Sequence, residues 1–174
     1  EQALPAAGEE PARAREAGAA AGPLSLPQKW VRGAPDGDGE NALAVAHAFL
    51  RTHVRPGAFA LDATAGNGHD TLYLAQKVGE RGHVYAFDVQ QAALDSTKER
   101  LAENGIPDER VTLILSGHER MADYVKEPVR CVLFNLGWLP SGDHSVTTRV
   151  PTTLAAVEAA CGLLLPGGMV SVCV

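Results

Sequence analysis

The chain has little of what marks disulfide-rich, membrane-spanning or strongly basic proteins. Its three cysteines, Cys131, Cys161 and Cys173, are an odd number without metal-ligand spacing, so we expect reduced core residues of an intracellular protein rather than a disulfide framework. No apolar run approaches the ~20 residues of a membrane span, and no signal-peptide core is seen. The 15 basic and 21 acidic residues give a net charge of -6, without the basic excess typical of nucleic-acid binders.

The length and composition predict one folded domain preceded by a tail. With 174 residues and 45% hydrophobic content, the chain can bury one core. Residues 1–40 are rich in Ala, Gly, Pro and Glu and lack apolar periodicity, so we predict a mobile tail followed by a domain over 41–174. The tail holds four basic and seven acidic residues, which leaves a net charge of -3 for the domain.

Apolar strand-like and helix-like segments alternate through the domain. Near-continuous apolar runs suit strands that are covered on both faces. The alternation predicts a Rossmann-like α/β fold, a doubly wound and mostly parallel sheet with helices on both faces. Because the chain ends within the fifth predicted strand, we expect C-terminal strands of this fold to be missing. The predicted strands are 57–62, 83–88, 110–115, 129–136 and 169–174, and the predicted helices are 41–53, 69–78, 91–104, 119–125 and 151–165, the last stopped by Pro166-Gly167-Gly168.

The segment LDATAGNGHD, residues 61–70, joins the first strand to a helix through two glycines. Gly66 and Gly68 allow a sharp turn and the close approach of a ligand, and amides at a helix start favour an anionic group. A dinucleotide fingerprint would place a third glycine where Thr71 stands. Asp62 instead ends the strand, where its carboxylate can accept a hydrogen bond from an ammonium group. The pattern is similar to the first motif of S-adenosylmethionine-dependent methyltransferases; a plain tight turn is the alternative.

A second acid, Asp88, ends the next predicted strand 26 residues after Asp62. An acid at this position can bind both hydroxyls of a ribose. Alternatively, Asp88 caps the helix predicted over 91–104, and the two roles are compatible.

The fourth strand leads into a second polar cluster that begins with Asn135. In methyltransferases that modify an amine on a nucleobase, an Asn or Asp stands at this position and is followed by Pro and an aromatic residue. The side-chain carbonyl of the Asn or Asp accepts a hydrogen bond from the nucleophilic nitrogen, and the aromatic ring offers its face to the base. The alternative is a Gly/Pro surface turn with a half-buried Trp138. Asp143 and His144 are our candidates for taking the amine proton, although Asp143 could instead brace the loop and His144 could be a surface residue.

Together, DATAGNGHDT, FDVQ, SGHE and FNLGWLPSGDHSVTTR with the following TTLAA resemble a small bacterial and plastid family once labelled rRNA methylases. That family is associated with methylation of the 5-aminomethyl group on the wobble uridine, position 34, of tRNA. The resemblance covers roughly residue 41 to the end. The chain departs from the family pattern at Trp138, where Tyr is expected, at His144, where Lys is usual, and in lacking the C-terminal strands.

The resemblance implies S-adenosylmethionine as the cofactor, S-adenosylhomocysteine (SAH) as its product, and direct displacement of the methyl group by an unprotonated amine. It implies no metal. The implied catalytic residues are Asn135, Asp143 and His144. The implied cofactor-binding residues are Asp62, Thr64, Gly66, Asn67, Gly68, His69, Asp70, Thr71, Asp88, Gln90, His118 and Asn135. The implied substrate-binding residues are Gly137, Trp138, Pro140, Thr147, Thr148 and Arg149.

The acidic net charge argues against the expected partner, the anticodon stem-loop of tRNA. Phosphate contacts would have to come from scattered residues such as Arg51, Arg55, Arg130 and Arg149, or from a second subunit of a homodimer. A small enzyme can still read one flipped base by stacking and hydrogen bonding. Methylation of a small metabolite or of rRNA, and a non-catalytic cofactor-binding subunit, remain open. We expect a soluble protein of the bacterial cytoplasm or of an organelle such as the chloroplast.

Overall fold

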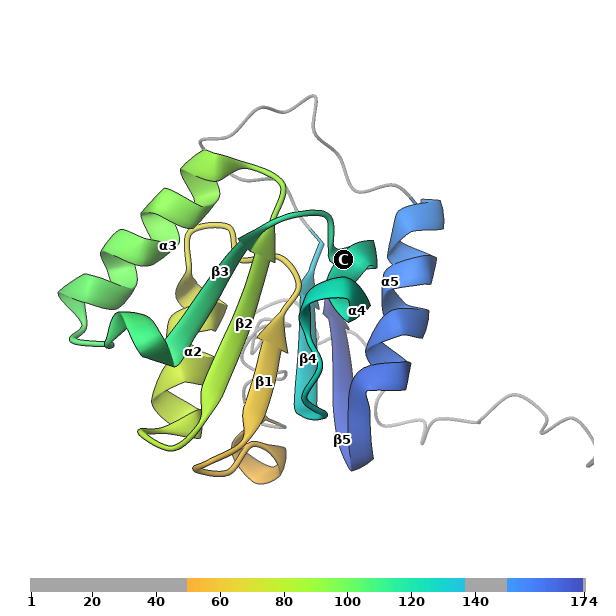
Figure 1. Ribbon diagram of the computed structural model, residues 1–174, viewed down its shortest axis with the longest axis horizontal. Coiled ribbons are helices and arrows are strands. Elements are labelled where there is room, and N and C mark those ends of the chain that lie inside the picture. The colour runs from red at the N-terminus through yellow and green to blue at the C-terminus, as the bar shows by residue number, and fades with distance from the viewer. Residues whose placement is uncertain (1–49, 137–149, 174) are drawn as a thin grey trace, which may run out of the picture. The chain divides into compact units, whose positions relative to one another are not determined.

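The computed structural model describes residues 50–136 and 150–173. Within these residues, five strands form one parallel sheet in the order β3-β2-β1-β4-β5 (Figure 1). This arrangement confirms the predicted Rossmann-like, doubly wound fold. The strands are β1 (Phe59–Asp62), β2 (His83–Asp88), β3 (Val111–Leu115), β4 (Val129–Asn135) and β5 (Leu164–Cys173).

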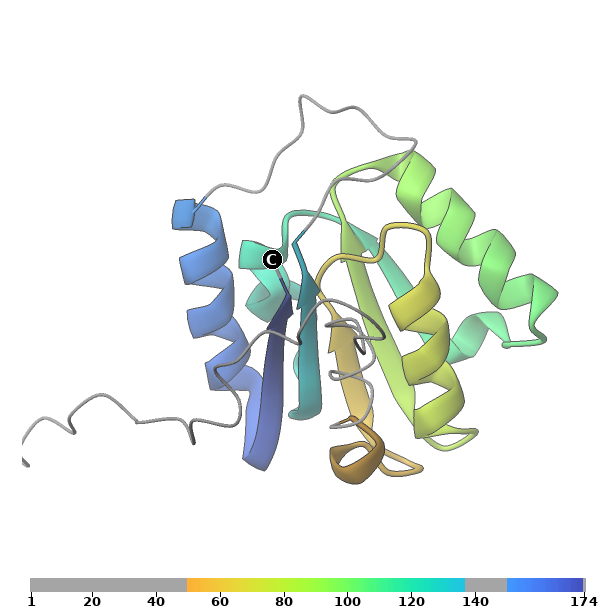
Figure 2. The same ribbon diagram turned by 180° about the vertical axis from the view of Figure 1, so that it is seen from behind.

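Helices cover both faces of the sheet, as predicted. In Figure 1, α4 lies in front of the strands and α5 stands beside β5, and in the reverse view of Figure 2 the helix α2 lies in front. Residues 50–53 form the end of the helix predicted over 41–53, whose earlier part lies outside the described residues. The helices are α2 (His69–Val78), α3 (Gln91–Glu103), α4 (Met121–Tyr124) and α5 (Val150–Leu163), with 3-10 turns η2 (Asp108–Arg110) and η3 (His118–Arg120).

The central strands divide their side chains between two apolar layers. Ala60 and Val84 pack with the buried residues of α2 and α3, whereas Leu61 and Phe87 pack with Met121 and the buried residues of α5. All five of these side chains are fully buried. Burial on both faces explains why these strands are near-continuous apolar runs in the sequence.

The start of β5 differs from the prediction. We expected Pro166-Gly167-Gly168 to end the helix and a strand to begin at Met169, but α5 ends at Leu163 and β5 begins at Leu164. Leu164 pairs with Val129 and Met169 with Cys131, so the register shifts between these two pairs. Gly167 has a φ of 72°, a conformation open to glycine, and the Pro-Gly-Gly segment therefore forms an irregularity inside the strand.

The prediction that the cysteines are core residues holds for Cys131, which is buried, and is wrong for Cys161, which is exposed on α5; Cys173 is partly buried. Apolar residues lie all around α5, so its sequence does not reveal which side faces the sheet.

Within the described residues, no helix is long and apolar enough to cross a membrane. The tail predicted over 1–40 lies outside the described residues and stays a prediction.

Candidate cofactor and active site

The carboxyl ends of the parallel strands bring the predicted polar residues to one edge of the sheet. The chain runs outward from β1 to β2 and β3 and then returns to β4 on the other side of β1, so the strand order reverses between β1 and β4. Ligands of doubly wound sheets bind at such a reversal. Here the backbone N–H of Asn135, at the end of β4, donates a 2.8 Å hydrogen bond to the Thr64 hydroxyl of the loop after β1. The loop is thereby joined to the tip of the strand that carries the predicted catalytic Asn135, whose side chain is exposed.

Asp62, at the end of β1, is buried inside the loop that follows it. Its side chain is 1% exposed. One carboxylate oxygen accepts the Thr64 N–H at 3.0 Å, and the other accepts the Thr71 hydroxyl at 2.6 Å. Burial raises the pKa of Asp62 to about 7, with Asp70 and Asp88 adding to the rise and the two hydrogen bonds opposing it. The structure shows Asp62 holding the two ends of the loop together, and its predicted role toward the ligand stays a prediction.

Asp88 is the acid that stays partly exposed at the strand ends. One carboxylate oxygen accepts the Gly66 N–H at 3.0 Å and the other accepts the Gln90 N–H at 2.9 Å. The N-cap of α3 is Gln90, so Asp88 does not cap this helix in the way the alternative interpretation supposed. A carboxylate oxygen can accept a second donor, and Asp88 therefore keeps acceptor capacity toward a ligand.

The glycines of the loop are required by its geometry. Gly66 has a φ of 52° and Gly68 a φ of 77°, both in the left-handed region that favours glycine. A Cβ on Gly68 would lie 2.8 Å from the Cα of Thr97 on α3, closer than non-bonded carbon atoms approach. Only glycine lets the loop pass this close to α3.

The sequence reasoning missed two residues of α3 that hold this loop from the side. The Thr97 hydroxyl donates to the Gly66 carbonyl at 3.1 Å, and the Arg100 Nε donates to the Asn67 carbonyl at 2.6 Å. Thr97 is fully buried, which is unusual for a polar residue in the middle of a helix. A threonine among the buried positions of a predicted amphipathic helix was the only available signal.

Two exposed apolar side chains flank Asp88. Val89 is 55% exposed and Leu115, which pairs with Asp88 across the sheet, is 53% exposed. His118 follows on η3, where its ring packs edge-on against Phe134 at a centroid distance of 5.7 Å. The Nε2 atom of His118 is buried and has no hydrogen-bond partner in the described part of the chain. Exposed apolar surface beside an acid, with an unsatisfied ring nitrogen nearby, suits a ligand with a flat apolar body and polar edges.

The remaining predicted cofactor residues differ in exposure. His69 is exposed at the start of α2, Asp70 and Thr71 are buried, and Gln90 is partly buried. Most of the predicted substrate side lies outside the described residues. This holds for Gly137, Trp138, Pro140, Asp143, His144, Thr147, Thr148 and Arg149.

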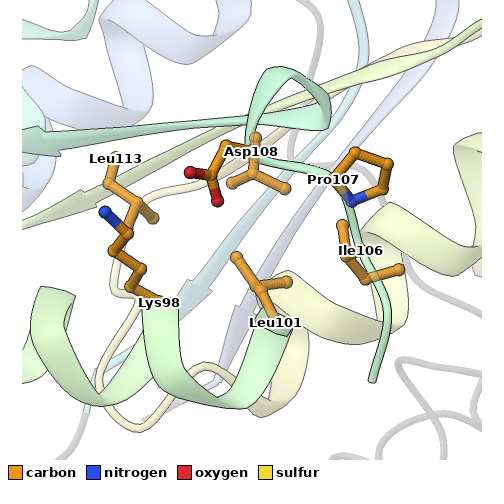
Figure 3. A pocket seen from close by; sticks show the side chains of 7 residues that line it. Lys98, Leu101, Ile106, Pro107, Asp108 and Leu113 are labelled. Atoms are coloured by element: carbon orange, nitrogen blue, oxygen red, sulfur yellow. The ribbon is translucent and has the colours of Figure 1, made fainter. Parts of the chain in front are cut away.

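A separate pocket of about 210 Å³ lies between α3 and the beginning of β3, away from the carboxyl ends of the strands (Figure 3). Its lining is mainly apolar, with Lys98 and Asp108 supplying charged groups. Because none of the predicted site residues lines it, we assign the site to the strand ends rather than to this pocket. The lining residues are Lys98, Leu101, Ile106, Pro107, Asp108, Val111 and Leu113.

Comparison with known proteins identifies the family. The sequence model of the family described as "Putative rRNA methylase" matches residues 84–174. A crystal structure of a "putative rRNA-methylase" from Clostridium thermocellum is 45% identical, with a TM-score of 0.73 over 76% of this chain and 70% of that one. The chain belongs to this family. The predicted resemblance is therefore confirmed.

Two further relatives bear on the ligand and the substrate. A "putative methyltransferase" from Streptococcus mutans, solved in complex with SAH, is 41% identical, with a TM-score of 0.69 over 76% of this chain and 71% of that one. The "tRNA (mnm(5)s(2)U34)-methyltransferase, chloroplastic" of Arabidopsis thaliana is 40% identical over 144 residues, 78% of this chain. The chain spans 53% of the length of this plant relative.

Proposed function

We propose that the chain is the S-adenosylmethionine-binding domain of a methyltransferase. The observation that carries the proposal is the arrangement around Gly66, whose N–H is held by Asp88 at the strand-order reversal of the sheet. This arrangement places an acid that can still accept hydrogen bonds next to a glycine loop and the start of a helix. The acid suits the hydroxyls of a ribose, and the amides at the helix start suit a carboxylate of the same ligand. The relative solved with SAH supports the same ligand.

The residues present fit this cofactor. Asp88 would bind the ribose hydroxyls, and Val89 and Leu115 offer apolar surface beside it for the adenine ring. The buried Nε2 of His118, which has no hydrogen-bond partner among the described residues, would bond a polar edge of the ligand. The loop from Gly66 to Gly68, which packs against Thr97 of α3, would receive the methionine end. Asp62 would act from inside the loop on the ligand's ammonium group.

The cofactor, when bound, supplies a methyl group made electrophilic by its sulfonium. The chain's own part is to align the nucleophile and to keep it unprotonated. Asn135 is placed for this because its backbone is tied to Thr64 while its side chain is exposed. We assign it the role of holding the attacking amine, with Asp143 or His144 accepting the proton.

The substrate that we favour is the 5-aminomethyl group of the wobble uridine of tRNA. The description of the plant relative supports this choice, and the family description favours rRNA as the alternative nucleic-acid substrate. Trp138 would stack on the base, with Gly137, Pro140, Thr147, Thr148 and Arg149 completing the substrate side. The description of the plant relative as chloroplastic supports a plastid location, and the bacterial cytoplasm is the alternative.

A small-metabolite substrate is the second candidate, and the charge is the observation that favours it. The net charge of -6 offers RNA phosphates no basic footprint. Arg51, Arg55 and Arg130 are scattered, so an RNA complex would use isolated contacts or a second subunit of a homodimer. Methyl transfer from labelled cofactor to hypomodified tRNA, with none to small amines, would reject the metabolite.

The binding step is tested by calorimetry with SAH on wild type, Asp88→Ala and the control Asp95→Ala. Asp95 is an exposed acid on α3 that accepts a hydrogen bond from Gln91 of the same helix. We expect Asp88→Ala to lose most of the affinity and Asp95→Ala to keep it. A wild-type chain that binds no SAH would favour a non-catalytic partner subunit.

Mass spectrometry of wobble nucleosides from cells with and without the gene then tests the substrate. We expect 5-aminomethyl uridine to accumulate when the gene is lost.

A further inference from the structure

The loop between Gly66 and Gly68 carries two peptide groups whose orientation the backbone alone does not determine. Glycine is nearly as stable with a positive as with a negative φ, so peptides next to Gly66 and Gly68 can rotate at little energetic cost. A loop that binds a ligand through its amides must keep these peptides in one orientation. We propose that Thr97 and Arg100 of α3 are positioning residues that set this orientation for cofactor binding; the inference rests on the proposed function.

The contacts come from one face of α3. Thr97 and Arg100 are three residues apart, so their side chains lie on the same side of the helix. Thr97 donates to the carbonyl of Gly66 at 3.1 Å, and Arg100 donates to the carbonyl of Asn67 at 2.6 Å (Figure 1 shows the loop passing beside α3). Two consecutive carbonyls are thus drawn toward α3.

Each carbonyl fixes the amide that shares its peptide plane. In a trans peptide, the C=O of one residue and the N–H of the next point in opposite directions. Because the Gly66 carbonyl points to Thr97, the N–H of Asn67 points away from α3. The N–H of Gly68 is used within the loop, where it donates to the Ala65 carbonyl at 2.8 Å. The Asn67 N–H has no hydrogen bond in the described part of the chain, so it is the loop amide available to an anionic group of the ligand.

Gly66 is held through both its N–H and its C=O, which belong to two successive peptide groups, and only the partner of the N–H is partly exposed. Its N–H donates to Asp88, and its carbonyl accepts from Thr97. Asp88 is partly exposed, whereas Thr97 is fully buried and so acts on the ligand only through the loop. The bond from Arg100 is charge-assisted and therefore stronger than that from a neutral donor.

Paired substitutions of Thr97 separate positioning from packing. Thr97→Val keeps the shape of the side chain and loses the hydroxyl; Thr97→Ser keeps the hydroxyl and loses the methyl group. Positioning predicts that Thr97→Val weakens SAH binding about three- to tenfold, from one lost hydrogen bond, while Thr97→Ser stays within about twofold of wild type. A packing role predicts the reverse order, and that order would overturn the inference.

Arg100→Met removes the second donor but keeps an apolar stem. We expect about tenfold weaker SAH binding and a raised KM for S-adenosylmethionine, with kcat at saturating cofactor within about twofold of wild type. Lys98→Met and Ser96→Ala are the controls, because both residues are exposed on α3 and neither is hydrogen-bonded to the loop in the described part of the chain. Equal losses in Arg100→Met and Lys98→Met would show that only the charge of the helix matters and would refute the role of Arg100.

Amide hydrogen exchange of Asn67, measured by NMR without ligand, keeps the test independent of the proposed function. The inference predicts altered exchange and chemical shift at Asn67 in Thr97→Val but not in Thr97→Ser. If the wild-type chain bound no SAH, the proposed function would fail while this measurement would still decide the loop orientation. An Asn67 amide unchanged in Thr97→Val would overturn the positioning role.

Discussion

The buried carboxyl of Asp62 makes a quantitative prediction about stability and pH. Its pKa is raised from an ordinary 3.8 to about 7, mainly because the side chain is buried. The folded chain therefore binds a proton more tightly than the unfolded chain, and this group's contribution to stability is fully present below about pH 4 and lost as the pH rises to about 7. Over the whole range the loss is ~4 kcal/mol, at 1.36 kcal/mol for each pH unit.

The variant Asp62→Asn isolates this contribution. An amide has nearly the same shape and stays neutral. Its oxygen can accept from the Thr64 N–H, and its NH₂ group can donate to the oxygen of the Thr71 hydroxyl, which in the wild type donates to the carboxylate. Between about pH 5.5 and about pH 8, wild type should lose ~2 kcal/mol of unfolding free energy relative to Asp62→Asn. Subtracting the variant removes the contributions of groups that titrate in both proteins.

Chemical denaturation of both proteins at the two pH values measures this difference. The denaturant dependence must be the same in both, so that the free energies are comparable. Curves that stay parallel from about pH 5.5 to about pH 8 would refute the reasoning, because the Asp62 carboxyl would then be ionised throughout, as a solvated one is. A difference of the opposite sign would mean that the hydrogen bonds from Thr64 and Thr71 outweigh burial.

Three further predictions follow from the site. Gly68→Ala should abolish SAH binding and lower the unfolding free energy by more than the control Gly105→Ala, for which we expect a loss of ~1–2 kcal/mol. Both glycines have a positive φ, but a Cβ would meet Thr97 at Gly68 and open space at Gly105. Thermal denaturation and calorimetry check this, and equal effects of the two substitutions would contradict it. Asn135→Ala should leave SAH affinity unchanged and lower kcat, since its side chain is exposed and only its backbone joins Thr64; a changed affinity with unchanged kcat would reverse the assignment. SAH affinity should rise between about pH 6 and about pH 8 in wild type but not in Asp62→Asn, because an ionised Asp62 attracts the ligand's ammonium group; calorimetry at both pH values tests it.

The fold could be predicted where the apolar pattern was regular. The predicted ranges of α2 and β2 match the structure at both ends, because α2 lies between Gly68 and Gly79 and β2 is a short apolar run that begins after Gly82 and ends at Asp88. The prediction failed at Pro166-Gly167-Gly168. These residues normally stop a helix, yet here they sit inside β5, since pairing with Val129 and Cys131 resumes on either side of them. Pairing with a distant strand is not visible in a local pattern.

The candidate site was predictable in its residue types and less so in their roles. Asp62 and Asp88 both end strands, and the sequence suggested that both face the ligand. Asp62 is the buried acid of the two because Thr71, nine residues further along the chain and across the glycine loop, lies against its carboxylate. The hydrogen bonds from Thr97 and Arg100 join residues more than 30 apart in sequence, and no short motif encodes them.

The two acids show how one residue type serves two purposes at neighbouring strand ends. Asp62 accepts hydrogen bonds from Thr64 and Thr71 at the two ends of its loop and is buried, so ionising its carboxyl group costs free energy. Asp88 accepts amides of two different segments, Gly66 and Gln90, and stays open to solvent, so it can meet a ligand without desolvating a buried charge. A cationic group that approached the loop would favour the ionised form of Asp62 and offset part of the cost of its burial. Ligand binding and the stability of the loop would then be linked through Asp62, although in our proposal the direct contact is made by Asp88.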